Sequence, residues 1–489
     1  MNNRNKIVIK ENMNSKSSDK KYIKAGIGYT FANYFIKGLS FITLPIYVRL
    51  MSTADYGNFN TYVAYKSMLS VVLGLALHAS LKNAKIRYSS KIEFSSYMAA
   101  CVQMGVISTA AIMVLANIIY PMLAGILELT RLVFNLLLIQ SYAAALLTLY
   151  NSYVSLEYKY KSYFAVSLVN AVSTTAISIF LITTWFSDDR YIGRVIGNAV
   201  PAIIIGMCIA ACFLCGTKSG LKFDAEKWRF GLTFSVPLIF HGVSQVILNQ
   251  FDRIMIKSMT GAENAGVYSF AYNIYNLVFV TSTSRQNVWG PWFYEKMVEK
   301  KYDLIRKRGN SFAFGMMLFI AAVLLVSPEL VGILGTKDYA SSVFYIAPLV
   351  VSGYFAFLYN LPAQIEYYYE KTNYIAGGTC AAAILNIILN YFGIKYFGSI
   401  AAAYTTLIIY LIYFLIHYCL AIKIHGQQIF DLMKLIVYSG ALVVVAVLSL
   451  FLKGQIVVRW CAILILCVLG ILWADKEFKV FSVLKKRAK

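Results

Sequence analysis

The sequence predicts an all-α polytopic membrane protein, and three observations predict it. Of the 489 residues, 59% are hydrophobic and only 14% are charged, whereas soluble domains carry about 25% charged residues. Apolar runs recur about every 30 residues, and each approaches the roughly 20 residues that a helix needs to cross the hydrocarbon core. The connections between these runs are short and contain most of the Lys and Arg residues.

The apolar runs predict about fourteen transmembrane helices. Composition marks the middle of each helix better than its ends, where polar residues continue the chain. The predicted helices span residues 22–48, 57–81, 96–117, 129–151, 164–185, 191–215, 230–256, 265–290, 308–327, 341–360, 372–392, 398–420, 433–452 and 458–474.

The basic residues predict the orientation, because Lys and Arg in short loops stay on the cytoplasmic side. With a cytoplasmic N-terminus, about 32 of the 45 Lys and Arg residues fall inside and about 10 fall outside. Both termini are therefore predicted to be cytoplasmic. The polar first 20 or so residues lack the apolar core of a signal peptide, so the first helix is expected to direct insertion.

The formal charge of +23 is spread over many loops. That distribution favours contact with anionic membrane lipids over binding of nucleic acid. The eight cysteines all fall in apolar runs. Cys212 and Cys215 form a C-x-x-C pair, but they have no His or acidic neighbours, so packing is favoured over a metal site.

Two short stretches are repeated along the chain. The segment 49–59 (RLMSTADYGNF) resembles 257–268 (KSMTGAENAGVY), and Gly57 and Gly266 are 209 residues apart. At the same offset, 150–160 (YNSYVSLEYKY) matches 359–369 (YNLPAQIEYYY). Chance similarity in a chain with 37 tyrosines is the alternative. A repeat that spans six helices, an even number, predicts parallel copies, which are typical of transporters.

The repeat divides the chain into two predicted lobes of six helices with two additional C-terminal helices. The predicted parts are a basic cytoplasmic tail (1–21), an N-lobe (22–215), a cytoplasmic linker (216–229), a C-lobe (230–420), the two extra helices (421–475) and a second basic tail (476–489).

Several motifs resemble the Wzx-type polysaccharide flippases of the multidrug/oligosaccharidyl-lipid/polysaccharide (MOP) exporter superfamily. The motifs are Leu44-Pro45, Arg49, Ala54-Asp55-Tyr56-Gly57, Asp252-Arg253 and Ala265-Gly266-Val267-Tyr268. The resemblance implies a MATE/MOP-like fold in a bacterial inner membrane. It also implies that the protein, acting as a transporter and not as an enzyme, moves an undecaprenyl-pyrophosphate-linked oligosaccharide to the outer leaflet by alternating access.

The same resemblance places the protein in O-antigen or capsule biosynthesis. The partners that it implies are the lipid-linked oligosaccharide, membrane lipids, a polysaccharide polymerase and a chain-length regulator. No cofactor is expected apart from a coupling ion, either H⁺ or Na⁺.

Two lysines are candidates for binding the pyrophosphate in a cationic cavity. Lys37 lies about 20 Å along its helix from either end, and Lys66 lies about 14 Å beyond Gly57. A charge at that depth costs at least about 2.5–3.5 kcal/mol, which makes such residues functional candidates. The alternative for Lys37 is a side chain that extends to an interface, about 20 Å away against a reach of about 6 Å.

Three arginines complete the predicted cationic cavity: Arg285, Arg49 and Arg253. Arg285 stands in a polar stretch (TSTSRQN) near the cytoplasmic end of its helix, where extension to the interface is the alternative. Arg253 follows Asp252, and a local ion pair is the alternative for these two residues.

Four residues are candidates for a gate or for ion coupling: Glu157, Glu366, Asp252 and His241. The two glutamates match each other in the repeat, and solvated loop charges are the alternative reading for both. His241, like His78 and His417, is a candidate because histidine titrates near neutral pH. A packed, hydrogen-bonded histidine is the alternative.

Two other functions are considered from the sequence. A membrane glycosyltransferase, polymerase or ligase needs groups on a substantial aqueous loop, yet the longest connection has about 20 residues, and nucleophile-elbow, P-loop and zinc motifs are absent. A drug or cation exporter of the same superfamily needs acidic residues inside its helices. The first two helices carry Lys37 and Lys66 and no acid, which favours an anionic cargo.

Overall fold

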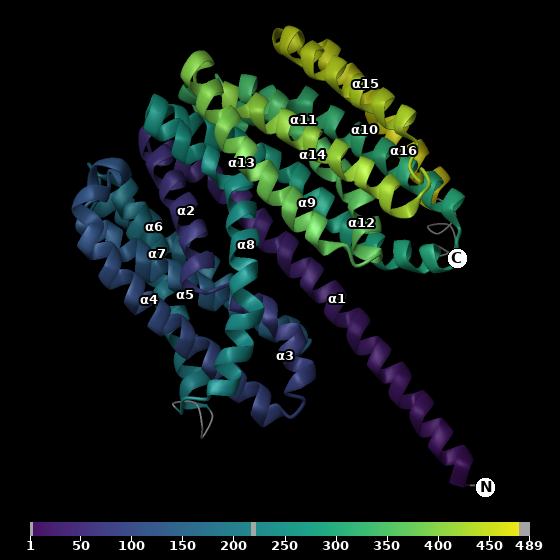
Figure 1. Ribbon diagram of the computed structural model, residues 1–489. Coiled ribbons are helices and arrows are strands. Elements are labelled where there is room, and N and C mark those ends of the chain that lie inside the picture. The colour runs from purple at the N-terminus through teal and green to yellow at the C-terminus, as the bar shows by residue number, and fades with distance from the viewer. Residues whose placement is uncertain (1–2, 217–221, 479–489) are drawn as a thin grey trace. The chain divides into compact units, whose positions relative to one another are not determined.

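The computed structural model describes residues 3–216 and 222–478, with the side chains of 3–25, 27, 284–288 and 478 left aside, and these ranges fold as helices without a strand (Figure 1). Twelve helices are long and apolar enough to cross a membrane, and a bent helix pair raises the number to thirteen within the described residues. The predicted all-α polytopic membrane fold is therefore confirmed.

Most helices extend beyond the apolar runs because their polar end turns are also helical. The N-terminal elements are α1 (Asn3–Leu50), α2 (Thr53–Leu73), η1 (Leu77–Ser80), α3 (Leu81–Arg87), α4 (Lys91–Leu127), α5 (Arg131–Leu156), α6 (Tyr160–Thr184) and α7 (Arg190–Cys215). The later elements are α8 (Ala225–Thr260), α9 (Ala262–Val298), α10 (Tyr302–Leu334), η2 (Lys337–Tyr339), α11 (Ser342–Leu358), α12 (Asn360–Tyr368), α13 (Thr372–Phe397), α14 (Ala401–His425), α15 (Leu432–Phe451), η3 (Leu452–Gly454) and α16 (Ile456–Phe478).

The second predicted helix, 57–81, is wrong as a single straight segment. Helix α2 ends at Leu73, and Leu75 and Ala76 then take positive φ angles of 50° and 48°. The chain continues as η1 and α3 at an angle of 52° to α2. Non-glycine residues rarely adopt positive φ, so composition gives no warning of this break.

The eighth predicted helix, 265–290, corresponds to α9, which has 37 residues. It is absent from the set of strongly apolar helices in the described residues, because Asn, Ser, Thr and Tyr interrupt its hydrophobic positions. Its length nevertheless exceeds the roughly 20 residues that a membrane span requires. Local capping fixes other helix ends, as at α4, where the Ser90 hydroxyl accepts a hydrogen bond from the Glu93 N–H and donates one to the Glu93 carboxylate.

The chain forms two compact units. Unit 1 comprises Met1–Leu50 and Tyr62–Val243, and unit 2 comprises Met51–Thr61 and Ser244–Lys489. The divisions fall inside α2 and α8, so each of these helices contributes one part to each unit. The six-plus-six repeat of the sequence and its lobe boundaries remain predictions.

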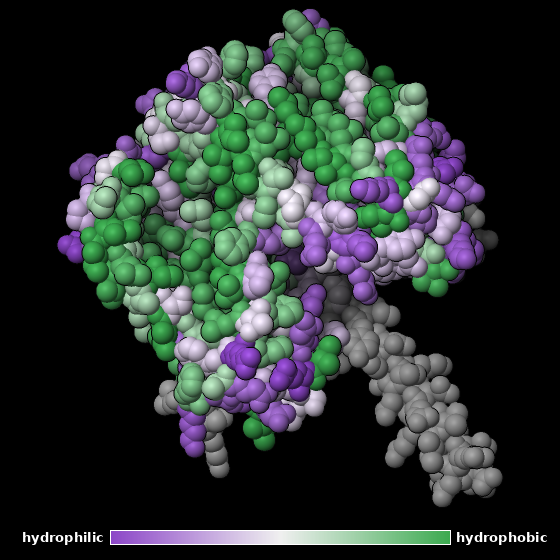
Figure 2. All heavy atoms as spheres, viewed as in Figure 1, coloured by the Kyte–Doolittle hydropathy of each residue, from purple (hydrophilic) through white to green (hydrophobic). Residues whose placement is uncertain are grey.

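Within unit 1, α6 packs against α7 and α1, and α7 packs against α5 and α4. An apolar core joins α3, α4 and α5 with η1; it includes Leu81, Tyr97, Met98 and Leu146, each no more than 4% exposed. Large hydrophobic side chains on the outer face of α4 are exposed, and Figure 2 shows this apolar covering. Such a face is expected where a helix meets lipid.

Within unit 2, α11 lies at the centre. Sixteen of its 17 residues are buried, and the helix packs against α9, α10, α14 and α15. Helices α15 and α16 pack on α10. Arg459 of α16 is 2% exposed and reaches Glu329 of α10 at 2.5 Å, so an ion pair with a buried arginine joins the C-terminal helix to the rest of unit 2.

The repeated glycines meet each other inside unit 2. A Cβ atom on Gly57 would lie 1.9 Å from the carbonyl oxygen of Ala262, and one on Gly266 would lie 2.0 Å from that of Thr53. The contact is symmetric, because Thr53 and Ala262 are separated by the same 209 residues as the two glycines. Only glycine permits backbones to approach this closely, which explains why the short stretch occurs twice.

Candidate functional site

Lys66 of α2 lies in a hydrogen-bonded network inside unit 1. Its Nζ donates to Oδ1 of Asn198 on α7 at 3.3 Å, and Gln140 Nε2 of α5 donates to the same oxygen at 2.8 Å. The Tyr62 hydroxyl donates to Gln140 Oε1 at 2.7 Å. Lys66 is half-buried, and no carboxylate forms a salt bridge with it within the described ranges. A neutral amide therefore holds this amino group.

Arg194 adds a second positive charge beside Lys66. It lies one turn before Asn198 on α7, and its guanidinium carbon is 3.3 Å from the centre of the Tyr47 ring. The aromatic face attracts the guanidinium group, while Arg194 and Lys66 are close enough to repel each other electrostatically. We call Tyr62, Lys66, Gln140, Arg194 and Asn198 the cationic network.

Lys37 belongs to a polar stripe on α1. Thr30, Asn33, Lys37 and Ser40 follow at intervals of three or four residues, which places them on one helix face, and all four are exposed. The Tyr163 hydroxyl of α6 donates to Asn33 Oδ1 at 2.5 Å. A polar stripe of this length favours contact with water over contact with acyl chains. No described hydrogen bond or salt bridge joins Lys37 to Lys66.

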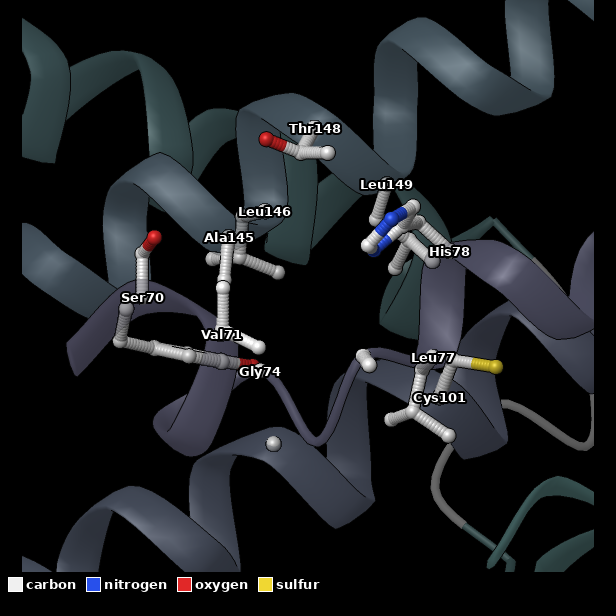
Figure 3. A pocket seen from close by; sticks show the side chains of 13 residues that line it. Ser70, Val71, Gly74, Leu77, His78, Cys101, Ala145, Leu146, Thr148 and Leu149 are labelled. Carbon is white, nitrogen blue, oxygen red and sulfur yellow. The ribbon is translucent and has the colours of Figure 1, made fainter. Parts of the chain in front are cut away.

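A polar groove of about 640 Å³ adjoins this stripe in unit 1. Tyr29 and Asn33 of α1 lie on one side, Asn151 of α5 lies on another, and Asn151 Oδ1 has no hydrogen-bond partner among the described residues. His78 and Thr148 line both the groove and a smaller cavity of about 80 Å³ at the break after α2. Figure 3 shows His78 and Thr148 at that cavity.

Unit 2 contains a second polar cluster, centred on Asp252 of α8. Its side chain is 1% exposed and accepts hydrogen bonds from three helices. The Tyr268 hydroxyl donates to Oδ2 at 2.6 Å, Asn390 Nδ2 donates to Oδ1 at 2.6 Å, and Thr406 Oγ1 donates to Oδ2 at 3.1 Å. Asn390 Nδ2 also lies 3.1 Å from Asn386 Oδ1. We call these five residues the Asp252 cluster.

Arg253 is 5% exposed in unit 2 and has its own contacts. It donates to the Asn249 carbonyl oxygen at 3.0 Å and to Gln250 Oε1 at 2.5 Å, and its guanidinium carbon lies 4.2 Å from the centre of the Tyr272 ring. Arg253 acts on Asp252 through a weaker electrostatic attraction. The hydrogen bonds to the Asp252 carboxylate come instead from polar side chains of other helices.

The remaining predicted cations lie elsewhere. Arg49 is exposed at the end of α1, where it contacts the Pro45 carbonyl oxygen at 3.3 Å. Arg285 belongs to α9, and its side chain lies outside the described residues. His241 of α8 is half-buried in unit 1, and its Nδ1 has no hydrogen-bond partner among the described residues.

The two repeat-related glutamates have different surroundings. Glu157 follows α5 and forms an ion pair with Lys85, with side chains 19% and 37% exposed. Glu366 lies within α12, where it is 0% exposed and contacts His417. The hairpins also differ in register, because Tyr158 and Glu370, which take positive φ after α5 and α12, are 212 residues apart. The gap-free match that equates the two glutamates stays a prediction.

Known proteins resemble this chain in sequence and in fold. A model of the family described as polysaccharide biosynthesis protein matches residues 23–297, more than half of the chain. The chain belongs to this family. The resemblance that the sequence motifs indicate is thereby confirmed. Protein 1 of the Lsg locus of Haemophilus influenzae is 20% identical over 422 residues, which cover 81% of this chain and 98% of that protein.

Solved structures of transporters share the fold of this chain. The lipid II flippase MurJ, in an inward closed conformation, matches with a TM-score of 0.73 and 14% identity, over 93% of this chain and 99% of that chain. An inward-facing MATE multidrug resistance transporter of the MOP superfamily matches with a TM-score of 0.62 and 13% identity, over 80% and 94%. Family and fold together support a multi-pass membrane transporter.

Several residues of these clusters are absent from the sequence-based candidates. Arg194 and Asn198 are four residues apart in a predicted helix, and so are Asn386 and Asn390. That spacing places each pair on one helix face, so pairs of polar residues inside apolar helices could have indicated both clusters. Their partners on other helices could not be found this way, because contacts between distant segments leave no local pattern.

Proposed function

We propose that this protein flips an undecaprenyl-pyrophosphate-linked oligosaccharide from the cytoplasmic to the outer leaflet of a bacterial inner membrane. The cargo would serve surface polysaccharide synthesis, such as O-antigen or capsule, and a polymerase and a chain-length regulator would act on it afterwards. Both termini would face the cytoplasm, and transport would proceed by alternating access.

The cationic network of unit 1 carries this proposal. An uncompensated amino group at membrane depth costs at least about 2.5–3.5 kcal/mol, and the amide of Asn198 repays only part of that cost. A pyrophosphate would supply the missing negative charge, since Lys binds phosphate as a point charge and Arg binds it with a bidentate fork. Lys66 and Arg194 therefore suit an anionic headgroup that must leave water.

The polar groove suits the sugar part of the cargo. Tyr29 and Tyr163 provide aromatic faces, while Asn33 and Asn151 provide amide groups that can bind hydroxyls. Aromatic rings combine an apolar face with a polar edge, which matches the amphipathic surface of a saccharide.

The Asp252 cluster is the proposed site of the coupling ion, H⁺ or Na⁺. Hard cations take oxygen ligands, and Asp252, Asn386, Asn390 and Thr406 offer carboxylate, amide and hydroxyl oxygens from three helices. A proton would instead neutralise the Asp252 carboxylate. A Na⁺ ion would replace hydrogen bonds that these oxygens now accept. Its binding among α8, α13 and α14 would change the packing of unit 2.

The proposal is tested by flipping assays in proteoliposomes that contain a fluorescent pyrophosphate-linked lipid. Replacing Lys66 with Ala removes a charged hydrogen-bond donor worth about 1.5–3 kcal/mol, so the rate should fall roughly 10- to 100-fold. Lys66→Arg should retain more activity than Lys66→Ala. Lys161→Ala is the matched control, because Lys161 is exposed in the same unit.

The same assay separates this cargo from that of a cation exporter. A cationic drug would depend on the carboxylate of Asp252 and be indifferent to Lys66. Full flipping of the pyrophosphate lipid by Lys66→Ala, together with export of a cationic dye that requires Asp252, would overturn the proposal.

A further inference from the structure

Glu366 and His417 form a fully buried pair in unit 2. Glu366 Oε1 of α12 lies 2.6 Å from His417 Nδ1 of α14, and both side chains are 0% exposed. The second oxygen of Glu366, Oε2, and the second nitrogen of His417, Nε2, have no hydrogen-bond partner among the described residues. The acid and the base therefore depend on each other for their polar contacts.

The surroundings of this pair are aromatic. The His417 ring centre lies 4.4 Å from that of Tyr413 and 5.7 Å from that of Tyr359. Tyr413 is held by Thr379 of α13, whose Oγ1 lies 2.8 Å from the tyrosine hydroxyl. A Cβ on Gly378 would lie 3.3 Å from His417 Nε2. The absence of a side chain at Gly378 therefore leaves room for the imidazole.

The titratable groups around the pair come from each packed helix. Tyr359 lies at the junction of α11 and α12, Tyr367 is on α12 and Tyr413 is on α14, and the last two interact electrostatically with Glu366. Lys371, which precedes α13, donates its backbone N–H to the backbone carbonyl oxygen of Glu366 at 2.8 Å. On α9, Tyr294 packs against Tyr368, and the side chains of 284–288 lie outside the described residues.

The number of protons on the pair sets its net charge. With one transferable proton, on either partner, the pair is neutral overall. A second proton makes it a buried cation, and the loss of the proton makes it a buried anion. A net charge without a partner in a site shielded from water is costly. Proton uptake or release therefore favours separation of α12 from α14, which would admit water.

We propose that Glu366 and His417 form a proton-binding site that links protonation to the packing of α12 on α14. This site is separate from the Asp252 cluster, which takes the coupling ion in the proposed function. Unit 1 has no such arrangement at Glu157, because its partner is a lysine and the pair is partly exposed. Histidine, by contrast, changes charge between about pH 5 and pH 8.

Magnetic resonance of the full-length protein in lipid nanodiscs, with isotope-labelled histidine, tests the site without any cargo. The chain has four histidines, so each imidazole signal can be assigned by a single His→Gln variant. We expect the His417 imidazole signal to change its protonation state as the pH is varied across the range in which the protein stays folded. In Glu366→Gln, which removes the only side-chain hydrogen-bond partner that the described residues give His417, that response should be altered or lost.

Two matched controls accompany this titration. His425→Gln removes a histidine of the same helix that contacts the Tyr369 hydroxyl at 2.9 Å, and Glu157→Gln neutralises the acid of unit 1. Neither should alter the His417 signal. A His417 signal that keeps one protonation state throughout, or that titrates identically in wild type and Glu366→Gln, would overturn the proposal. The wild-type measurement decides the first of these outcomes even if a variant fails to fold.

Proton binding and cargo transport can fail separately. Because the titration needs no lipid-linked sugar, an unchanged His417 signal would contradict the proton site and leave the flippase proposal intact. Conversely, loss of flipping in Lys66→Ala with a normal His417 titration would support both.

Discussion

Unit 1 holds the amino group of Lys66 among its helices, whereas unit 2 holds the carboxylate of Asp252. Lys66 is held by neutral Asn198, with Arg194 nearby. Asp252 is saturated by three neutral donors from α9, α13 and α14. Opposite charges, each held by hydrogen bonds with neutral side chains, suggest different ligands, an anion for unit 1 and a cation for unit 2.

Charge reversal in unit 1 should have the largest effect. Lys66→Glu places a carboxylate where the cargo phosphate is proposed to bind, and like charges at close range cost several kcal/mol. We expect flipping to fall by a factor on the order of 100 or more, while membrane insertion is preserved. Lys161→Glu, at an exposed position of the same unit, should flip normally; equal losses in both variants would argue for a general charge effect.

Disrupting the close backbone contact at Gly57 and Gly266 of unit 2 should have the second-largest effect. Gly57→Ala places a methyl group 1.9 Å from a backbone oxygen, and overpacking of this kind costs about 1–3 kcal/mol or more. The midpoint of thermal unfolding in detergent should drop clearly. Gly38→Ala is the matched control, since a Cβ there meets nothing within 4 Å; a comparable drop in that variant would disprove the close contact.

Neutralising Asp252, the buried acid of unit 2, should affect ion coupling more than it affects cargo binding. Asp252→Asn keeps the size of the side chain and removes its charge, so the response of flipping to an imposed H⁺ or Na⁺ gradient should disappear. Exposed Asp338 of the same unit provides the control variant Asp338→Asn. A gradient response that survives in Asp252→Asn would separate this cluster from ion coupling.

The sequence predicts the helices well because hydrophobic length is a local property. Lys66 could be selected for the same reason, since a lysine inside an apolar run is visible without knowledge of its neighbours. The break after Leu73 was not predictable, because it rests on positive φ angles at Leu75 and Ala76. Likewise, the burial of Glu366 depends on α14, which no pattern near Glu366 reveals.

The partly exposed ion pair of unit 1 should contribute little. Glu157→Gln breaks the contact with Lys85, and exposed pairs contribute at most about 1 kcal/mol to stability. Thermal unfolding should therefore change only slightly, and far less than in Glu366→Gln, where a buried histidine loses its partner. Equal destabilisation by the two variants would contradict the difference in burial between these acids.

A surface acid of unit 2 should have the smallest effect on pH dependence. Hydrogen bonds from Lys301 and Lys296 lower the pKa of Glu299 from 4.5 to about 2. A lowered pKa stabilises the fold above pH 4.5, and this contribution is lost only as the pH falls through about 2. Glu299→Gln should thus leave the pH profile of unfolding unchanged between about pH 5 and pH 8; a shifted profile would assign the transition to this surface acid.

Direct binding of an undecaprenyl pyrophosphate lipid to the purified protein in nanodiscs tests the central claim about the two units. Binding should weaken roughly 10- to 100-fold in Lys66→Ala, weaken further when Arg194 is also replaced by Ala, and remain unchanged in Asp252→Asn. Equal affinity of the wild type and the Lys66/Arg194 double variant, or equal affinity for a lipid without phosphate, would contradict an anion-binding interior in unit 1.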